Sequence, residues 1–295
     1  MSVCGRPSDL WRAAVLVLWA GTAAAQDPAP QGQGSIPDAP APRRVVSINL
    51  CTDQLAMLLA SPGQLVSVSH LALDPLSSSM VEQAGAYVIN RGGAEQVYLL
   101  HPDLVLAGTY TSPATVDLLR RLGVPVLQVP PVESLSEVAD QMRLIGSALG
   151  QAQAGEAMAK AFTGALDDLA VPGPKATAAM YYPNGYTAGA GTLSDEILTL
   201  TGFQNVGGTA GLTGGGILPL ERLVMAAPRM VVTSTPYPGQ SRAEEILTHP
   251  ALQAIRDSAL TSRISDADWV CGTPYLLRAV RAMAEARHAI SESTP

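Results

Sequence analysis

The first half of the chain alternates short apolar runs with stretches of helical periodicity. Buried strands are predicted where brief, largely β-branched runs are bounded by polar or turn residues, at 44–48, 65–69, 104–107 and 124–129. Helices are predicted between them, at 52–60, 95–100 and 115–122. This alternation is typical of an α/β lobe around a mostly parallel sheet.

A longer helical tract follows. Ser134 and Glu137 have the spacing of a capping box, and apolar residues from Leu135 to Leu149 then recur at intervals of three and four. Gly150 predicts a break, after which the alanine-rich segment 151–169 is a good helix former. A long helix here would form a stiff spine between two α/β halves.

The second half repeats the alternation. Strands are predicted at 178–182, 230–234 and 263–267, and helices at 195–201, 220–226, 250–258 and 275–290. Segment 207–216 is rich in glycine and lacks the lysine and Ser/Thr of a phosphate-binding loop, so it is interpreted as a mobile loop.

One unit occurs in both halves. Glu95 is followed seven residues later by Pro102 and then an apolar strand, and Glu221 is followed seven residues later by Pro228 and then an apolar strand. Each unit comprises an acidic helix start, a short helix, a proline stop and a buried strand. Such an internal repeat predicts two similar lobes on either side of a cleft.

Composition narrows the function. The chain has 295 residues, only 15% of them charged, and a net charge of −7. It contains no run of Lys and Arg, which argues against nucleic acid as a partner. The motifs G-x-S-x-G, S-x-x-K, H-E-x-x-H and G-x-x-x-x-G-K-[ST] are absent, so we expect no enzyme and no catalytic residues. A secreted metal-dependent hydrolase with scattered ligands is the alternative.

The N-terminus has the features of an export signal over 1–25. Arg6 and Arg12 precede an apolar run too short to span a bilayer, and Ala23-Ala24-Ala25 fits the cleavage rule. No cysteine stands at the cleavage site, so the prediction is a periplasmic protein that is not a lipoprotein. The proline-rich segment 26–42 is expected to be a disordered lead-in.

Cleavage would leave two cysteines, Cys51 and Cys271. An oxidising compartment favours a disulfide between them, although two free thiols remain the alternative because sequence does not give their separation. Each cysteine follows a predicted strand in a different half. A disulfide would therefore bridge the lobes and limit their opening.

Ligands of α/β lobes bind beyond the carboxyl ends of the strands. The side chains expected there include several aromatic rings, which suit a large, flat, partly polar ligand. The predicted cleft residues are Cys51, His70, Arg91, Tyr110, Tyr182, Tyr186, Tyr237 and Trp269.

Two of these side chains have alternative readings. Arg91 either pairs with an anionic chelate or is an ordinary surface residue. His70 either ligates a metal in the ligand or is merely hydrogen-bonded. The four histidines show no metal-ligand spacing, so neither an intrinsic metal site nor a cofactor is predicted. A free zinc or manganese carrier is a further alternative.

The ordered set of segments resembles the periplasmic binding proteins of importers for iron-siderophores, haem and cobalamin. The similarity rests on 43–48, on 90–106, on 119–126, on the predicted spine helix, on the Glu221 unit and on Asp268-Trp269, and it extends from about residue 43 to 290. The resemblance implies an N-terminal lobe at 43–133, a helical tract at 134–172 and a C-terminal lobe at 173–295.

The resemblance also implies a function and partners. The chain would capture a ferric siderophore, cobalamin or haem as a monomer, and would deliver it to an ABC permease with its ATPase. In this family a glutamate on each lobe pairs with arginines of the permease. The matching positions in this sequence are Glu95 and Glu221.

Overall fold

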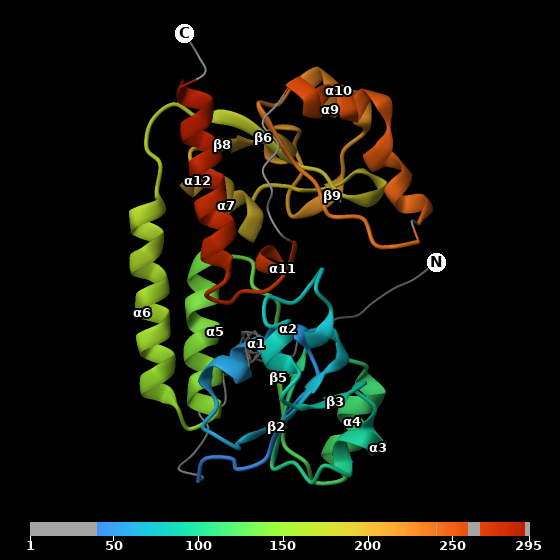
Figure 1. Ribbon diagram of the computed structural model, residues 1–295, viewed down its shortest axis with the longest axis vertical. Coiled ribbons are helices and arrows are strands. Elements are labelled where there is room, and N and C mark those ends of the chain that lie inside the picture. The colour runs from blue at the N-terminus through green and yellow to red at the C-terminus, as the bar shows by residue number, and fades with distance from the viewer. Residues whose placement is uncertain (1–39, 240, 259–265, 293–295) are drawn as a thin grey trace, which may run out of the picture. The chain divides into compact units, whose positions relative to one another are not determined.

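The computed structural model describes residues 40–239, 241–258 and 266–292. The predicted signal peptide and most of the predicted lead-in lie outside these residues. The described strands form a five-stranded sheet, a three-stranded sheet and a two-stranded sheet (Figure 1). The predicted α/β class is confirmed. Within the described part of the chain, no helix is both long and apolar enough to cross a membrane.

The N-terminal sheet has the strand order β3-β2-β1-β4-β5, and all its pairs are parallel. Its strands are β1 (Val45–Ser47), β2 (Leu65–Ser69), β3 (Val88–Asn90), β4 (Leu104–Gly108) and β5 (Val126–Val129). Val45 and Leu106 point to one face of the sheet and Val46 and Val105 to the other, and all four are fully buried. Helices therefore cover both faces, as parallel sheets require.

Helix α1 (Leu50–Leu59) contributes Leu55 to the first face, and α3 (Ala94–Tyr98) and α4 (Pro113–Arg121) contribute Val97 and Leu119 to the second. Sequence patterns predicted β1, β2, β4 and β5 of this sheet. They did not predict β3, a strand of three residues whose Val88 is exposed, nor the short helices η1 (His70–Leu73) and α2 (Val81–Ala84).

The helical tract forms two packed helices, α5 (Leu135–Ala148) and α6 (Ala152–Leu169). Gly150, at a φ of 72°, makes the turn between them. A Cβ on Gly146 would lie 2.8 Å from the Cα of Gly155, so the helices cross at a distance that only glycine permits. Ser134 caps α5 by accepting from the amide of Glu137, whereas the Glu137 carboxylate accepts from the amide of Glu133. The reciprocal half of the predicted capping box is therefore absent.

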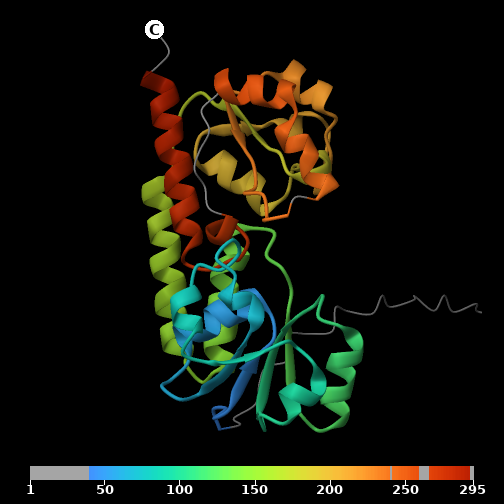
Figure 2. The ribbon, with the colours of Figure 1, turned by 45° about the vertical axis from the view of Figure 1, so that its right-hand side comes forward.

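The C-terminal sheet has the parallel order β10-β6-β8. Its strands are β6 (Ala176–Met180), β8 (Phe203–Asn205) and β10 (Met230–Val232). The helices around it are α7 (Leu193–Leu200), α8 (Val206–Thr209), α9 (Leu220–Ala226), η3 (Arg242–Thr248), α10 (Pro250–Ser258) and α11 (Asp266–Trp269). The last helix, α12 (Leu276–Glu292), packs along α6 (Figures 1 and 2).

Two predictions for this half were wrong. The glycine-rich segment 207–216 is not a plain loop, because it contains most of α8 and the start of β9 (Gly215–Ile217), which pairs antiparallel with β7 (Tyr186–Ala188). A Cβ on Gly207 would lie 2.3 Å from the carbonyl oxygen of Ala188, so close packing explains the glycine there. Of the strand predicted at 263–267, residues 266 and 267 are helical in α11, and the others lie outside the described residues.

The internal repeat is present in the backbone. β1 pairs with β2 and β4, and β6 pairs in the same way with β8 and β10. The amide of Asp103 donates to the carbonyl of Arg44 at 3.0 Å, and the matching amide of Arg229 donates to the carbonyl of Thr177 at 3.0 Å. The predicted units around Glu95 and Glu221 are therefore equivalent parts of two related substructures.

Candidate functional site

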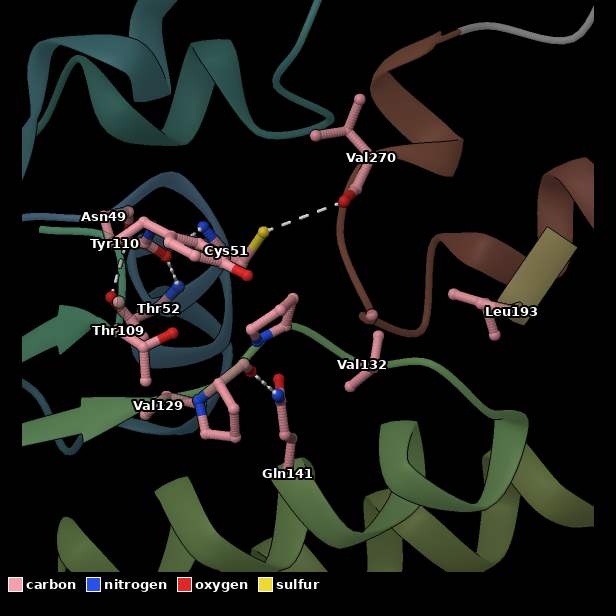
Figure 3. Close-up of a pocket in the computed structure, with 14 residues that line it drawn as sticks. Asn49, Cys51, Thr52, Thr109, Tyr110, Val129, Val132, Gln141, Leu193 and Val270 are labelled. Carbon is pink, nitrogen blue, oxygen red and sulfur yellow. Dashed lines mark hydrogen bonds between the residues drawn. The ribbon is translucent and has the colours of Figure 1, made fainter. Parts of the chain in front are cut away.

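The segment after α11 is tied to the start of α1 by a disulfide. Cys51 and Cys271, which are 220 positions apart in sequence, have an S–S distance of 2.13 Å and Cα atoms 5.1 Å apart. Asn49 fixes the start of α1, since its side-chain oxygen accepts from the amides of Cys51 and Thr52 at 3.1 and 3.3 Å. The disulfide sulfur of Cys51 also lies 3.9 Å from the carbonyl oxygen of Val270 (Figure 3).

Further polar contacts join segments that are far apart in the chain. The Ser79 hydroxyl lies 2.7 Å from a carboxylate oxygen of Asp268. The Tyr237 hydroxyl donates to Asp74 at 2.9 Å, and its pKa is raised chiefly by this bond. Together with the disulfide, these contacts bring segment 74–79, Tyr237 and segment 266–271 together.

A first cavity, of about 140 Å³, lies at the carboxyl ends of β1, β4 and β5. Figure 3 shows its lining, with the Asn49 side chain and the Gln141 amide among the polar groups. Gly108 is required here because a Cβ would lie 2.8 Å from the Asn49 side-chain nitrogen. The Gln141 amide donates to the carbonyl of Pro130 and so holds the segment that follows β5. None of the described residues that line this cavity is charged.

A second cavity, of about 340 Å³, lies beyond the carboxyl ends of β6 and β10. Three aromatic side chains line it, those of Tyr182, Tyr237 and Trp269. The Trp269 indole N–H donates to the Ser194 hydroxyl at 3.0 Å, which fixes the ring. Val270 lines both cavities and is 55% exposed, so the two cavities meet at this residue.

Two carboxylates line the second cavity. Glu244 accepts from the amides of Ser241 and Tyr237, and these bonds hold its pKa below the ordinary value. Asp266 accepts from the amide of Thr235 at 2.7 Å, but burial outweighs this bond and raises the pKa of Asp266. Burial, with smaller contributions from Asp266 and Tyr186, also raises the pKa of Tyr182, so its hydroxyl stays a hydrogen-bond donor.

A third carboxyl group, that of Asp53, is buried in α1. Its neighbour in sequence, Thr52, lines the first cavity. Asp53 accepts from the amide and the hydroxyl of Ser69, at 3.1 and 2.5 Å. Burial nevertheless raises the pKa of Asp53 to about 6, because desolvation outweighs the hydrogen bonds from Ser47 and Ser69. Asp53 lines neither cavity.

The structure brings together five of the eight predicted cleft residues. Cys51 and Tyr110 line the first cavity, and Tyr182, Tyr237 and Trp269 line the second. His70, Arg91 and Tyr186 line neither, and all three are exposed.

Sequence reasoning missed several lining residues. Ser234 is the last residue of the strand predicted at 230–234 and Thr235 directly follows it, so this position was a usable signal. Ser77, Glu244 and Asp266 reach the cavity only through tertiary packing, so no local pattern marked them.

Glu95 and Glu221 lie away from both cavities. Each is an exposed residue in the first turn of its helix, α3 or α9. Among the described residues, neither carboxylate takes part in a hydrogen bond or ion pair. The residue four positions later is apolar in both units, and Leu99 is 72% exposed and Met225 85% exposed.

Comparison with known proteins identifies the family. A family model described as "Periplasmic binding protein" matches residues 45–262. The chain belongs to this family. Its members are binding proteins of transport systems rather than enzymes.

One curated relative and two solved structures illustrate the similarity. The chain is 26% identical over 205 residues to the "Uncharacterized ABC transporter substrate-binding lipoprotein YvrC" of Bacillus subtilis, a match that covers 65% of the chain and 64% of the relative. The chain thus spans somewhat less than two thirds of the length of this relative.

The two structures show the fold. The periplasmic heme-binding protein RhuT from Roseiflexus sp. RS-1 matches with a TM-score of 0.66 at 22% identity, covering 83% of this chain and 99% of that one. The periplasmic vitamin B12-binding protein BtuF of Vibrio cholerae matches with a TM-score of 0.62 at 19% identity, covering 86% and 99%.

Proposed function

We propose that this protein captures a metal chelate in the two cavities that meet at Val270 and delivers it to an ABC permease. The chelate would be a ferric siderophore, cobalamin or haem, and the protein would act as a monomer in the periplasm, as a soluble protein rather than a lipoprotein. Membership of the family supports the transport role, and the relatives described above are named for haem, vitamin B12 and an ABC transporter.

The observation that carries the proposal is the shape and lining of the site. The second cavity offers Tyr182, Tyr237 and Trp269, and the first adds apolar and hydrogen-bonding groups on the other side of Val270. Aromatic walls with a few polar groups suit a large, partly apolar ligand better than a small hydrated ion. A planar or compact chelate would contact both sides of Val270.

The proposed division of the chain follows from the same account. Residues 43–133 and 173–295 would form the two lobes, and the tract 134–172 would connect them. Because Cys271 is bonded to Cys51, the segment after α11 is held to the N-terminal lobe. The disulfide would therefore restrict how far the lobes separate on ligand release.

Glu95 and Glu221 are the proposed contacts with the permease, whose ATPase would drive uptake. They occupy equivalent positions in the repeat, and both are exposed without a partner among the described residues. A permease with two-fold symmetry would present the same arginine pocket to each. The exposed Leu99 and Met225 lie one helical turn further along and would be buried at the same contact.

A ligand panel on the purified protein tests the proposed function. We expect saturable one-to-one binding of at least one chelate by isothermal titration calorimetry, with a rise in melting temperature. Zn²⁺ and Mn²⁺ salts, tested alongside, would bind tightly only if the protein were a free-metal carrier. A panel in which no chelate binds would contradict the proposal.

A further inference from the structure

The second cavity has a charge that restricts its ligand. Its lining includes Glu244 and Asp266, and Tyr237, also in the lining, donates its hydroxyl proton to a third carboxylate, Asp74, at 2.9 Å. Among the described residues, no arginine, lysine or histidine lines either cavity. A ligand in this site would therefore be surrounded by negative rather than positive charge.

The carboxylates are held in place by the backbone. Glu244 accepts from two amides and Asp266 from one, and these bonds leave lone pairs on both groups that can accept further hydrogen bonds. Ser234 also lines this cavity, and its hydroxyl oxygen is buried without a hydrogen-bond partner among the described residues. The lining thus has carboxylate acceptors available to a ligand that donates hydrogen bonds.

The aromatic rings of the second cavity also disfavour an anionic ligand. The faces of Tyr182, Tyr237 and Trp269 carry partial negative charge, so they attract cations and tolerate neutral π-systems. An anionic ligand would meet carboxylates and aromatic rings together. At an effective dielectric constant of about 20, one charge pair about 10 Å apart changes a binding constant by roughly tenfold.

We infer that the ligand is a metal chelate without net negative charge, with amide or amine groups that donate hydrogen bonds to the cavity. This inference rests on the proposed function and selects among the chelates that it allows. Polyanionic chelates, such as haem with its two carboxylates or a triscatecholate ferric complex, would be disfavoured.

Four probes of different charge test the inference: neutral cyanocobalamin, cationic ferrioxamine B, haemin and the triscatecholate complex ferric enterobactin. We expect cyanocobalamin or ferrioxamine B to bind at least about tenfold more tightly than either anionic probe, as the charge-pair estimate above implies. Tighter binding of an anionic probe would overturn the charge inference and leave chelate capture standing. Binding of no probe would contradict the proposed function itself, and the inference with it.

Variants that neutralise Glu244 and Asp266 test whether these two charges cause the preference for chelates without net negative charge. The double variant Glu244→Gln, Asp266→Asn keeps acceptor oxygens for the backbone amides, so we expect it to fold and to narrow the difference in affinity between cationic and anionic probes by at least about tenfold. Glu245→Gln is the matched control, since it removes a neighbouring charge that lines neither cavity. If the folded double variant kept the same difference in affinity between cationic and anionic probes, the inference would be overturned. The same would follow if Glu245→Gln reduced that difference equally.

Discussion

His101 and Ala227 hold the same left-handed backbone conformation at the same position in the two repeats, with φ values of 49° and 41°. Each follows its glutamate by six residues and directly precedes the proline that ends the helix. Residues with a Cβ rarely adopt this conformation, because it costs about 1–2 kcal/mol relative to the right-handed one. Its occurrence at both positions indicates that the two units share one backbone path.

This relationship makes a prediction about stability. Ala227→Gly removes the clash of a Cβ in a left-handed conformation, so we expect it to raise the free energy of unfolding by about 0.5–1 kcal/mol. Ala161→Gly makes the same chemical change in the middle of α6, at an exposed site, and should lower that free energy by about 1 kcal/mol. Urea denaturation measures both. Destabilisation by Ala227→Gly would show that this residue is not strained.

The repeat was the part of the fold that sequence predicted best, because it consists of buried apolar strands and proline stops. The strands β3 and β8 escaped prediction because neither is a continuous buried apolar run, since Val88 is exposed in β3 and the polar Gln204 is exposed in β8. The glycines of 207–216 were read as signs of mobility, whereas Gly207 permits close packing against Ala188.

The site was predicted in part for a similar reason. Residues that follow strands, such as Tyr110 and Tyr182, could be placed by the rule that ligands bind at the carboxyl ends of strands. Glu244 and Asp266 lie on short helical segments whose approach to the cavity depends on tertiary packing alone.

The raised pKa of Asp53 predicts a dependence of stability on pH. Between about pH 4 and pH 6 the folded protein keeps a proton on Asp53 that the unfolded chain has released. The free energy of unfolding therefore falls as the pH rises through this window. Above the window, the destabilisation caused by the buried, ionised Asp53 carboxylate is fully present.

Asp53→Asn isolates this effect. At pH 8 the variant should be more stable than the original protein by about 3 kcal/mol, and at pH 4 the two should differ little. Denaturation curves at a series of pH values measure the difference between the two proteins, which cancels the other carboxylates. A difference that stays constant from pH 4 to pH 8 would show that Asp53 is ionised throughout.

The disulfide predicts a thiol count. A chain that begins at Gln26 contains Cys51 and Cys271 and no other cysteine. Titration of the unfolded protein should find no free thiol without reductant and two after reduction. The Cys51→Ser, Cys271→Ser double variant should lose about 2–4 kcal/mol of stability, because the cross-link restricts the unfolded chain. Two thiols in the unreduced protein would refute the bond.

If Glu95 and Glu221 contact the permease, changing them should lower transport without changing ligand binding. Glu95→Arg together with Glu221→Arg should leave the dissociation constant of the chelate unchanged, since both residues lie outside the cavities. Uptake through the permease and ATPase in reconstituted vesicles should fall by about tenfold or more, because like charges would face the permease arginines. Glu82→Arg, an exposed glutamate in the first turn of α2 without a counterpart in the repeat, is the matched control. Normal uptake by the double variant would remove both glutamates from the interface.

Trp269 offers the most direct test of chelate capture in the second cavity. It is the only tryptophan in a chain that begins at Gln26, and it lines this cavity, so its emission reports on the site. The measurement is a titration of this emission with cyanocobalamin, ferrioxamine B, haemin and ferric enterobactin, corrected with free tryptophan for light absorbed by the chelates. We predict that at least one chelate quenches the Trp269 emission and that the quenching saturates at one equivalent. If all four chelates changed the protein emission only as much as they change that of free tryptophan, chelate capture in the second cavity would be contradicted.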